Sequence, residues 1–244
     1  MNVSANTLFH FTPKIEYLKS IIENGFFPRY CLESNFIMTD ADRWAIPMVC
    51  FCDIPLANTK KHKEKYGDYC IGLSKDWAIK KGLSPILYTT HNSHLSKSLV
   101  IQRKMILESL KDKDDIFISA EIYDRLLYTS FFIKEYEGFQ NKNRKYKNSI
   151  RFYDEREWRY VPSRIEVKHS IYPPMVSEKI VSDNNKLNNY NNKLKNACTL
   201  KFDSSDIKYV ILPTEDEVVK FSNEVPYSNL KNKILSFEKI FDDF

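Results

Sequence analysis

The chain has 244 residues, of which 43% are hydrophobic and 14% aromatic, and it carries a formal net charge of +5. This apolar content is enough for a folded core, and no segment approaches the roughly 18 consecutive apolar residues of a membrane-spanning helix. The N-terminus lacks the basic and apolar regions of a signal peptide, and the five cysteines include no CxxC pair. We therefore expect a cytoplasmic protein without disulfides, a zinc site or a membrane partner.

The first 25 residues predict a strand followed by a helix. The segment LFHF at residues 8–11 is short and aromatic, as many strands are. Thr12 and Pro13 fit the N-cap and the first position of a helix. Apolar residues then recur at helical spacing between residues 15 and 22, and Gly25 is the expected stop signal.

A second group of elements is predicted between residues 48 and 82. Residues 48–52 are apolar without interruption, which is typical of a buried strand. Asp53 is expected to cap a short helix that carries the lysines of residues 60–65. Residues 68–74 predict another strand, after which Ser74 caps a helix that ends at Gly82.

The middle of the chain predicts a helical insertion at about residues 95–137. Apolar residues recur there every three or four positions, and the charged run at residues 111–115 is the expected loop between two helices. Strands resume at residues 149–162, where Glu157 and Arg159 would share one face of a strand.

The C-terminal part predicts a loop, a strand and a helix. Residues 182–196 are rich in asparagine and show no clear period, so we expect a long flexible loop there. Residues 206–213 predict a strand, and Thr214 and Glu217 have the spacing of a capping box. With strands at both ends and no linker between the halves, the sequence predicts a single α+β domain over residues 1–244.

The common nucleotide-binding and hydrolase motifs are absent, and a content of only five glycines argues against a phosphate-cradling loop. Among the remaining candidates, the acidic pair Glu155 and Glu157 is the most suggestive. A strand would place both carboxylates on one face, about 7 Å apart. On a partly buried face we expect at least one raised pKa and a role as general base or as stabiliser of a cationic sugar. Alternatively, the two glutamates and the neighbouring arginines form an exposed ladder of weak ion pairs.

Other candidate residues have structural explanations as well. His10 lies between two phenylalanines and fits a core histidine that is hydrogen-bonded to the backbone. Cys50 and Cys52 share one face of an apolar strand, where cysteine usually acts as a small hydrophobic residue. His91 and His94 have a spacing that metal ligands can have, but no third ligand follows nearby, so no metal site is predicted.

Positive charge is concentrated in two lysine-rich runs, at residues 60–65 and 141–147. Such runs are usually solvated surfaces, although they would also attract a polyanion such as a nucleic acid.

Four segments resemble the AbiGi family of bacterial abortive-infection proteins. They are LFHFTPKIEYLKSIIENGFFPRY, PMVCFCDIPL, YGDYCIGLSKDW and YDEREWRYVP, in this order within residues 7–162. The DEREWRYVP segment is the most specific of them. The resemblance implies a role in antiphage defence, and because the family is generally labelled as the antitoxin half of a two-gene system, it also implies a cognate toxin or antitoxin as partner.

The opening HFT and the helix after it also resemble, locally, the DarT-type DNA ADP-ribosyltransferases. This resemblance implies an ADP-ribosyltransferase-like sheet core that uses NAD as a substrate. By this resemblance His10 and Thr12 would bind NAD, Glu157 would be catalytic and Glu155 would be auxiliary.

The same resemblance implies two further roles. The tyrosine that stacks on nicotinamide is assigned first to Tyr30, with Tyr66 and Tyr88 as alternatives. The arginine that positions the substrate is assigned first to Arg43, with Arg29 as the alternative. The residues CFC replace the Ser-Thr-Ser type of strand that the ADP-ribosyltransferase fold has at this place.

The sequence thus leads to two hypotheses of different classes. One is an NAD-dependent ADP-ribosyltransferase that modifies a nucleic acid or a protein, or uses water as acceptor. Cleavage of the nicotinamide–ribose bond passes through a cationic state, which a fixed carboxylate stabilises. The other is a non-catalytic antitoxin that neutralises a partner toxin by direct binding.

Overall fold

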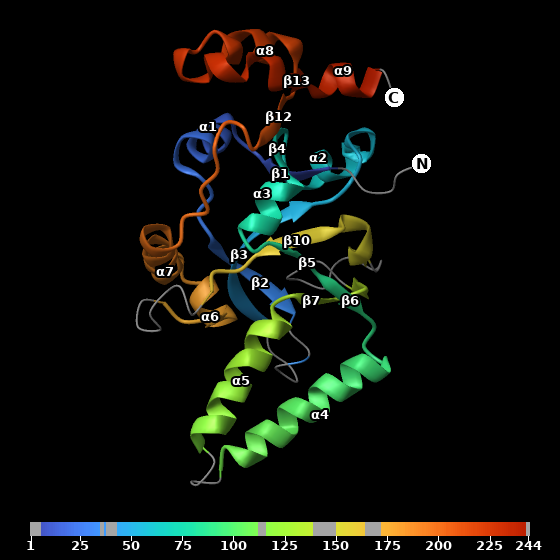
Figure 1. The fold of residues 1–244 in the computed structure, drawn as a ribbon, viewed down its shortest axis with the longest axis vertical. Helices are drawn as coiled ribbons and strands as arrows, with labels where there is room; N and C mark the ends of the chain where they lie inside the picture. The colour runs from blue at the N-terminus through green and yellow to red at the C-terminus, as the bar shows by residue number, and fades with distance from the viewer. Residues whose placement is uncertain are drawn as a thin grey trace.

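The computed structural model describes residues 6–34, 37, 43–111, 116–138, 150–163 and 172–242. As the sequence predicts, the chain has a mixed α+β fold, and its nine-stranded sheet is mostly antiparallel (Figure 1). The strands of this sheet are β1 (Thr7–Thr12), β2 (Arg29–Ser34), β3 (Arg43–Cys52), β4 (Tyr69–Ser74), β5 (Ser84–Pro85), β10 (Glu157–Tyr160), β11 (Val176–Ser177), β12 (Ile207–Leu212) and β13 (Ile234–Ser236). Their main order is β13-β12-β4-β1-β3-β10-β5, and β2 and β11 also pair with β3.

Helices surround this sheet, and two short strand pairs lie outside it. The α-helices are α1 (Ile15–Asn24), α2 (Lys60–Tyr66), α3 (Lys75–Lys80), α4 (His94–Ser109), α5 (Ile116–Ser130), α6 (Glu178–Val181), α7 (Asn184–Ala197), α8 (Glu215–Ser222) and α9 (Phe237–Asp242). The strand pairs are β6 (Leu87–Thr89) with β7 (Ile133–Glu135) and β8 (Glu137–Gly138) with β9 (Ile150–Arg151). Short 3-10 helices cover Leu56–Asn58, Phe152–Glu155 and Val225–Lys233. Within the described ranges, no helix has the length and apolar character needed to cross a membrane.

Strand β3 changes its neighbours half-way along its length. It begins earlier than predicted and includes Pro47. Its first half pairs with β2 and β11, and its second half pairs with β10. At its last residue, Cys52 lies opposite both Phe9 of β1 and Glu157 of β10. Residues from three strands that are far apart in the sequence therefore meet at this end of β3.

Helix α1 follows β1 and returns the chain to β2. Its N-cap is Lys14 rather than the predicted Thr12, because β1 continues through Thr12. The helix stops as predicted at Gly25, whose φ of 82° is readily adopted by glycine.

Alternate side chains of β3 enter two different apolar cores. Val49 and Phe51 belong to a large core that includes residues of α1, α3 and α8. Ile46 and Met48 belong to a second core with residues of α5. Successive side chains of a strand point to opposite faces, so this part of the sheet is covered on both faces.

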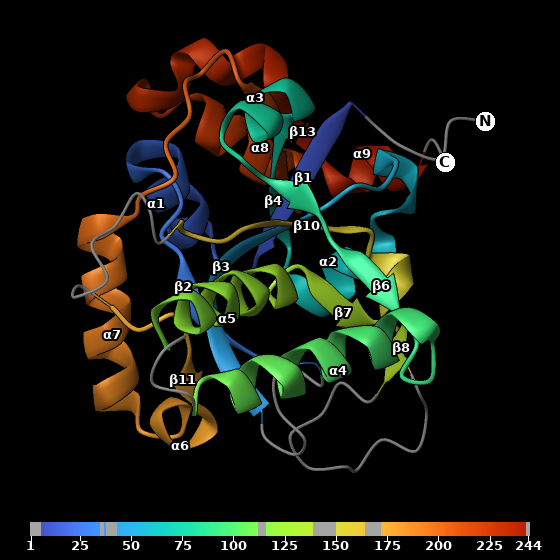
Figure 2. The same ribbon diagram turned by 60° about the horizontal axis from the view of Figure 1, so that its bottom comes forward.

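Helices α4 and α5 form the helical insertion that the sequence predicts. They pack against each other and extend away from the sheet (Figure 1). Figure 2 shows the same two helices from another side, with β6 leading into α4 and α5 leading into β7. The loop predicted between them lies outside the described residues except for Lys111.

The prediction of a flexible loop at residues 182–196 is wrong, because most of this segment forms helix α7. The Asp183 side chain caps the helix by accepting a backbone hydrogen bond from its first turn. Leu187, Tyr190 and Leu194 recur at three- and four-residue spacing and pack into an apolar cluster with β2 and β3 residues. Three apolar residues among many asparagines carry this amphipathic face.

The predicted helix caps are partly confirmed. Ser74 caps α3 and Thr214 caps α8, in each case by accepting a backbone hydrogen bond. Asp53 does not cap the lysine-rich helix α2, whose N-cap is Thr59. Asp53 is instead buried, and its carboxylate lies 2.8 Å from Nζ of Lys75.

Candidate functional site

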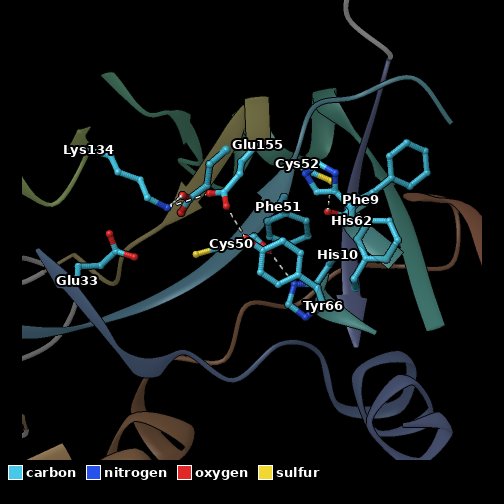
Figure 3. Close-up of a pocket in the computed structure, with 12 residues that line it drawn as sticks. Phe9, His10, Glu33, Cys50, Phe51, Cys52, His62, Tyr66, Lys134 and Glu155 are labelled. Atoms are coloured by element: carbon cyan, nitrogen blue, oxygen red, sulfur yellow. Dashed lines mark hydrogen bonds and ion pairs between the residues drawn. The ribbon is translucent and has the colours of Figure 1, made fainter. Parts of the chain in front are cut away.

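Two adjoining cavities lie along β3. The smaller cavity has a volume of about 230 Å³ and the larger cavity about 480 Å³. They share four lining residues, which are Glu33, Tyr66, Lys134 and Glu155. Figure 3 shows the smaller cavity, whose other lining residues are Phe9, His10, Phe11, Cys50, Phe51, Cys52, His62 and Glu157.

His10 and Glu157 line the same cavity, although they come from the first and the tenth strand. β1 and β10 both pair with β3, and Phe9 and Glu157 lie opposite the same Cys52, so these two side chains share one face of the sheet. His10 is the next residue of β1 and packs on the other face, against Phe26 and Phe51, so the pairing alone does not bring its ring to Glu157. The resemblance to ADP-ribosyltransferases implies that both side chains contact one bound NAD molecule, and this role stays a prediction.

The His10 ring is held in one tautomer. Its Nδ1 lies 2.8 Å from the carbonyl oxygen of Cys50, and since a carbonyl only accepts, Nδ1 carries the proton. The ring packs against Phe26 and Phe51, with centroid distances of 5.0 and 5.5 Å. Burial lowers the pKa of His10, against the opposite effect of the Cys50 carbonyl. His10 is therefore a neutral imidazole whose Nε2 is an acceptor.

The two glutamates reach one cavity without sharing a strand, which corrects the predicted arrangement. Glu155 is the last residue of a 3-10 helix, Arg156 adopts a left-handed conformation with φ of 45°, and only Glu157 belongs to β10. Nevertheless, Nζ of Lys134 lies 3.0 Å from Oε2 of each glutamate. This lysine bridges the two carboxylates (Figure 3).

Further partners hold each carboxylate separately. The buried Arg159 side chain donates from Nε to Oε1 of Glu157, and its Nη2 lies 3.1 Å from Glu33. Glu155 accepts hydrogen bonds from Lys65 and, at 2.6 Å, from the hydroxyl of Tyr66. The alternative of an exposed ion-pair ladder is therefore wrong, since Glu155 and Glu157 are 8% and 6% exposed.

The pKa values of both glutamates are lowered, whereas we predicted that at least one would be raised. Burial alone would raise the pKa of Glu157, but the charges of Arg159 and Lys134 outweigh it and lower the pKa to about 2. Burial likewise opposes the effect of Lys134, Lys65 and Tyr66 on Glu155, whose pKa is also lowered. Both side chains are thus anions at neutral pH, and their lowered pKa values make them weak proton acceptors, poorly matched to a general-base role.

The other predicted site residues, Tyr30, Arg43 and Thr12, do not line the smaller cavity. Tyr30 and Arg43 line the larger cavity. The Tyr30 hydroxyl donates to the carbonyl of Pro173 at 2.6 Å, and Arg43 lies 3.8 Å from the carboxylate of Glu178. Thr12 is buried at the end of β1 and is not among the described residues that line either cavity.

Of the three tyrosines considered for stacking, Tyr66 contacts Glu155 and Tyr88 contacts Glu157, whereas the hydroxyl of Tyr30 is bound to Pro173. Tyr66 lines both cavities and binds Glu155. The Tyr88 hydroxyl accepts a hydrogen bond from the backbone N–H of Glu157 at 3.0 Å. Tyr66 is the tyrosine that forms a wall of the smaller cavity.

Sequence reasoning missed Lys134, Glu33 and His62. Lys134 lies inside the predicted helical insertion, near its end, whereas the structure places it on β7. Its one signal is a charged residue in the otherwise apolar-aromatic stretch FFIKEY. Glu33 is on β2, a strand that was not predicted. His62 was counted with its lysine neighbours, yet it lines the smaller cavity, and its buried Nε2 has no hydrogen-bond partner within the described residues.

The cysteines behave as the sequence predicts. All five are free, and burial raises the pKa of Cys50 and Cys52, so their thiols stay protonated. No group of three potential metal ligands occurs in the part of the chain that the structure describes. His91 lies 3.7 Å from the Glu135 carboxylate and is largely exposed.

The fold and the site define an α+β protein with a buried, densely charged cavity between strands of its sheet. A family model described as "Putative abortive phage resistance protein AbiGi, antitoxin" matches residues 24–213. The abortive phage resistance protein AbiGi of Lactococcus lactis subsp. cremoris is 27% identical over an alignment of 264 positions, gaps included, which covers 96% of this chain and 98% of the relative. The chain belongs to the AbiGi family, as the four sequence segments indicated. No solved structure matches it.

Proposed function

We propose that the chain acts in abortive phage resistance by cleaving the nicotinamide–ribose bond of NAD in the smaller cavity and transferring ADP-ribose to a nucleic acid or a protein. Membership in the AbiGi family supports the defence role. The observation that carries the chemistry is the meeting of His10 and Glu157 in one cavity. An ADP-ribosyltransferase-like arrangement of the sheet is part of this proposal.

The role proposed for Glu157 follows from its charge. As the glycosidic bond breaks, nicotinamide leaves with the bonding electron pair and positive charge develops on the ribose. A buried carboxylate that stays ionised down to a pH of about 2 is available to stabilise that charge. The acceptor then forms the new bond to the same ribose carbon and gives up its proton.

The roles proposed for the cavity walls follow from their chemistry. His10 offers Nε2 as an acceptor for a ribose hydroxyl, because Nδ1 is bound to the Cys50 carbonyl. Aromatic side chains, including Phe9, Phe51 and Tyr66, supply flat surfaces suited to the nicotinamide ring. The remainder of NAD would extend into the larger cavity, which Arg43 lines.

A direct test compares NAD cleavage by the purified protein and by Glu157→Gln. We expect the substitution to lower the rate roughly 100-fold or more, as loss of an electrostatic stabiliser does in other enzymes. Glu121→Gln on the exposed side of α5 is the matched control and should not change the rate. Nicotinamide release and ADP-ribosylated products are both measured, so that transfer and hydrolysis are distinguished.

Glu157→Gln also leaves Arg159 less well compensated, so its thermal unfolding must be recorded in parallel. His10→Gln provides a second variant that changes no charge at neutral pH, and it should raise the KM for NAD. The proposal fails if the wild-type protein neither binds nor cleaves NAD at high protein concentration.

The word "antitoxin" in the family description supports a second candidate function, in which the chain neutralises a toxin by direct binding. In that case, co-expression with the product of the neighbouring gene should give a complex that co-purifies and should suppress its toxicity. Glu157→Gln should leave both results unchanged, because the cavity charge lies away from solvent. Absence of both association and rescue would exclude this candidate.

A further inference from the structure

The Lys134 ammonium contacts one oxygen of each of the two carboxylates that line the smaller cavity. Its Nζ lies 3.0 Å from Oε2 of Glu155 and 3.0 Å from Oε2 of Glu157, and its side chain is 13% exposed. It also lies 4.8 Å from the centroid of the Phe152 ring. A substrate hydroxyl or cation that approaches these oxygens must compete with a charge that is already there.

Lys134 is not required to hold the carboxylates in place. Glu157 is oriented by Arg159, which contacts both of its oxygens, through Nε and, at 3.3 Å, through Nη2. Glu155 is oriented by Lys65 and Tyr66, which both contact Oε1. The contribution of Lys134 is therefore mainly its charge.

That charge decides the sign of the field in the cavity. Three carboxylates, those of Glu33, Glu155 and Glu157, face three cations, which are Lys65, Lys134 and Arg159. With the cluster balanced, little net negative potential is left to favour a cationic ribose. Withdrawal of one cation leaves the cluster with an excess negative charge.

We propose that Lys134 is a self-blocking cation, which neutralises the Glu155–Glu157 pair in the free protein and must leave both Oε2 atoms before the site can stabilise a cationic substrate. This inference rests on the proposed function, since it concerns the same carboxylates. It adds that the protein described here is in its blocked state.

The surroundings of Lys134 provide a place for the displaced ammonium. Lys134 lines the larger cavity as well as the smaller one, so an ammonium that leaves both Oε2 atoms can lie in the larger cavity. Lys134 also belongs to β7, which begins three residues after the end of α5. Displacement of the α4–α5 hairpin would therefore pull directly on the strand that carries the blocking charge.

The test compares Lys134→Met with Lys134→Arg, using nicotinamide riboside as a probe that carries the cationic ring and the ribose but no phosphate. By calorimetry, Lys134→Met should bind this probe about tenfold more tightly than the wild type, because a repelling charge within a few ångströms is gone. Lys134→Arg should keep the wild-type affinity, and so should Lys104→Met on the exposed part of α4. In NAD cleavage, Lys134→Met should be faster than the wild type.

Loss of a buried cation can prevent folding, so a charge-balanced variant completes the test. Lys134→Met combined with Glu155→Gln removes one charge of each sign, so the cluster is balanced again and the affinity for nicotinamide riboside should return to about the wild-type value. Unchanged or weaker binding by folded Lys134→Met, or an equal gain of affinity in the charge-balanced double variant, would overturn the blocking role. If Lys134→Met gains affinity but neither it nor the wild type cleaves NAD, the blocking role stands and the proposed function fails. If NAD cleavage depends on Glu157 but Lys134→Met gains no affinity, the proposed function stands and the blocking role fails.

Discussion

Glu157 and Arg159 form a buried ion pair at the centre of the site, with exposures of 6% and 1%. A buried pair stabilises a fold only when its remaining hydrogen-bonding groups are also satisfied. Here the guanidinium also donates to the carbonyl of Phe131 and contacts Glu33, while the carboxylate also contacts Lys134. Substituting either member of the pair should therefore affect stability as well as any activity.

The lowered pKa of Glu157 predicts how stability depends on pH. Because the folded-state value is about 2 rather than 4.5, this side chain contributes its full stabilisation above pH 4.5 and loses it as the pH falls toward 2. The free energy of unfolding, measured with denaturant at several pH values in that window, should fall less steeply for Glu157→Gln than for Glu121→Gln. Equal slopes for the two variants would contradict the assigned pKa.

The sequence could suggest individual residues of the site but not their complete charge balance. His10 and Glu157 were singled out through the local resemblance to ADP-ribosyltransferases, which implies a histidine on the first strand and a glutamate on a later one. The lowered pKa values of the two glutamates could not be predicted from the sequence. They depend on Lys134 and Arg159, whose distances to the carboxylates are set by tertiary packing.

Among the elements, helix α7 is the clearest difference between prediction and structure. Asparagine has a low helix propensity, and composition therefore favoured a loop. Tertiary packing outweighs that propensity because Leu194 is completely buried and Leu187 and Tyr190 pack beside it. Helices α4 and α5 were predicted on either side of the 111–115 loop from apolar residues at three- and four-residue intervals. The predicted helical segment continued too far, because residues 133–135 form strand β7.

The packing of α7 leads to a stability prediction. Leu194→Ala should lower the free energy of unfolding by roughly 2–5 kcal/mol, because it opens a cavity at a fully buried position. Asn188→Ala, at an exposed position of the same helix, should raise it by a few tenths of a kcal/mol through helix propensity. Denaturant unfolding of both variants measures the difference, and a similar small effect at both positions would mean that α7 does not contribute to the cooperative unit.

At the scale of the whole molecule, the α+β class followed from the sequence, whereas the topology did not. Antiparallel pairing of β1 and β10 with β3 is a long-range property, and the strands lack turn signals that would connect them directly. Neither cavity could be predicted, because each is formed by side chains from helix α2 and from several strands, β7 among them. The AbiGi family model matches residues 24–213, which include β2, β3, α2, β7 and β10 but not β1.

Strand β3 connects these cavities, since Arg43 at its beginning lines the larger one and Cys50 and Cys52 near its end line the smaller one. A one-residue slip of this strand would exchange its two faces and disturb both cavities at once. A random mutagenesis screen for inactive alleles should therefore recover many hits within these ten residues. Most of those alleles would report a misplaced strand rather than a missing reactive group.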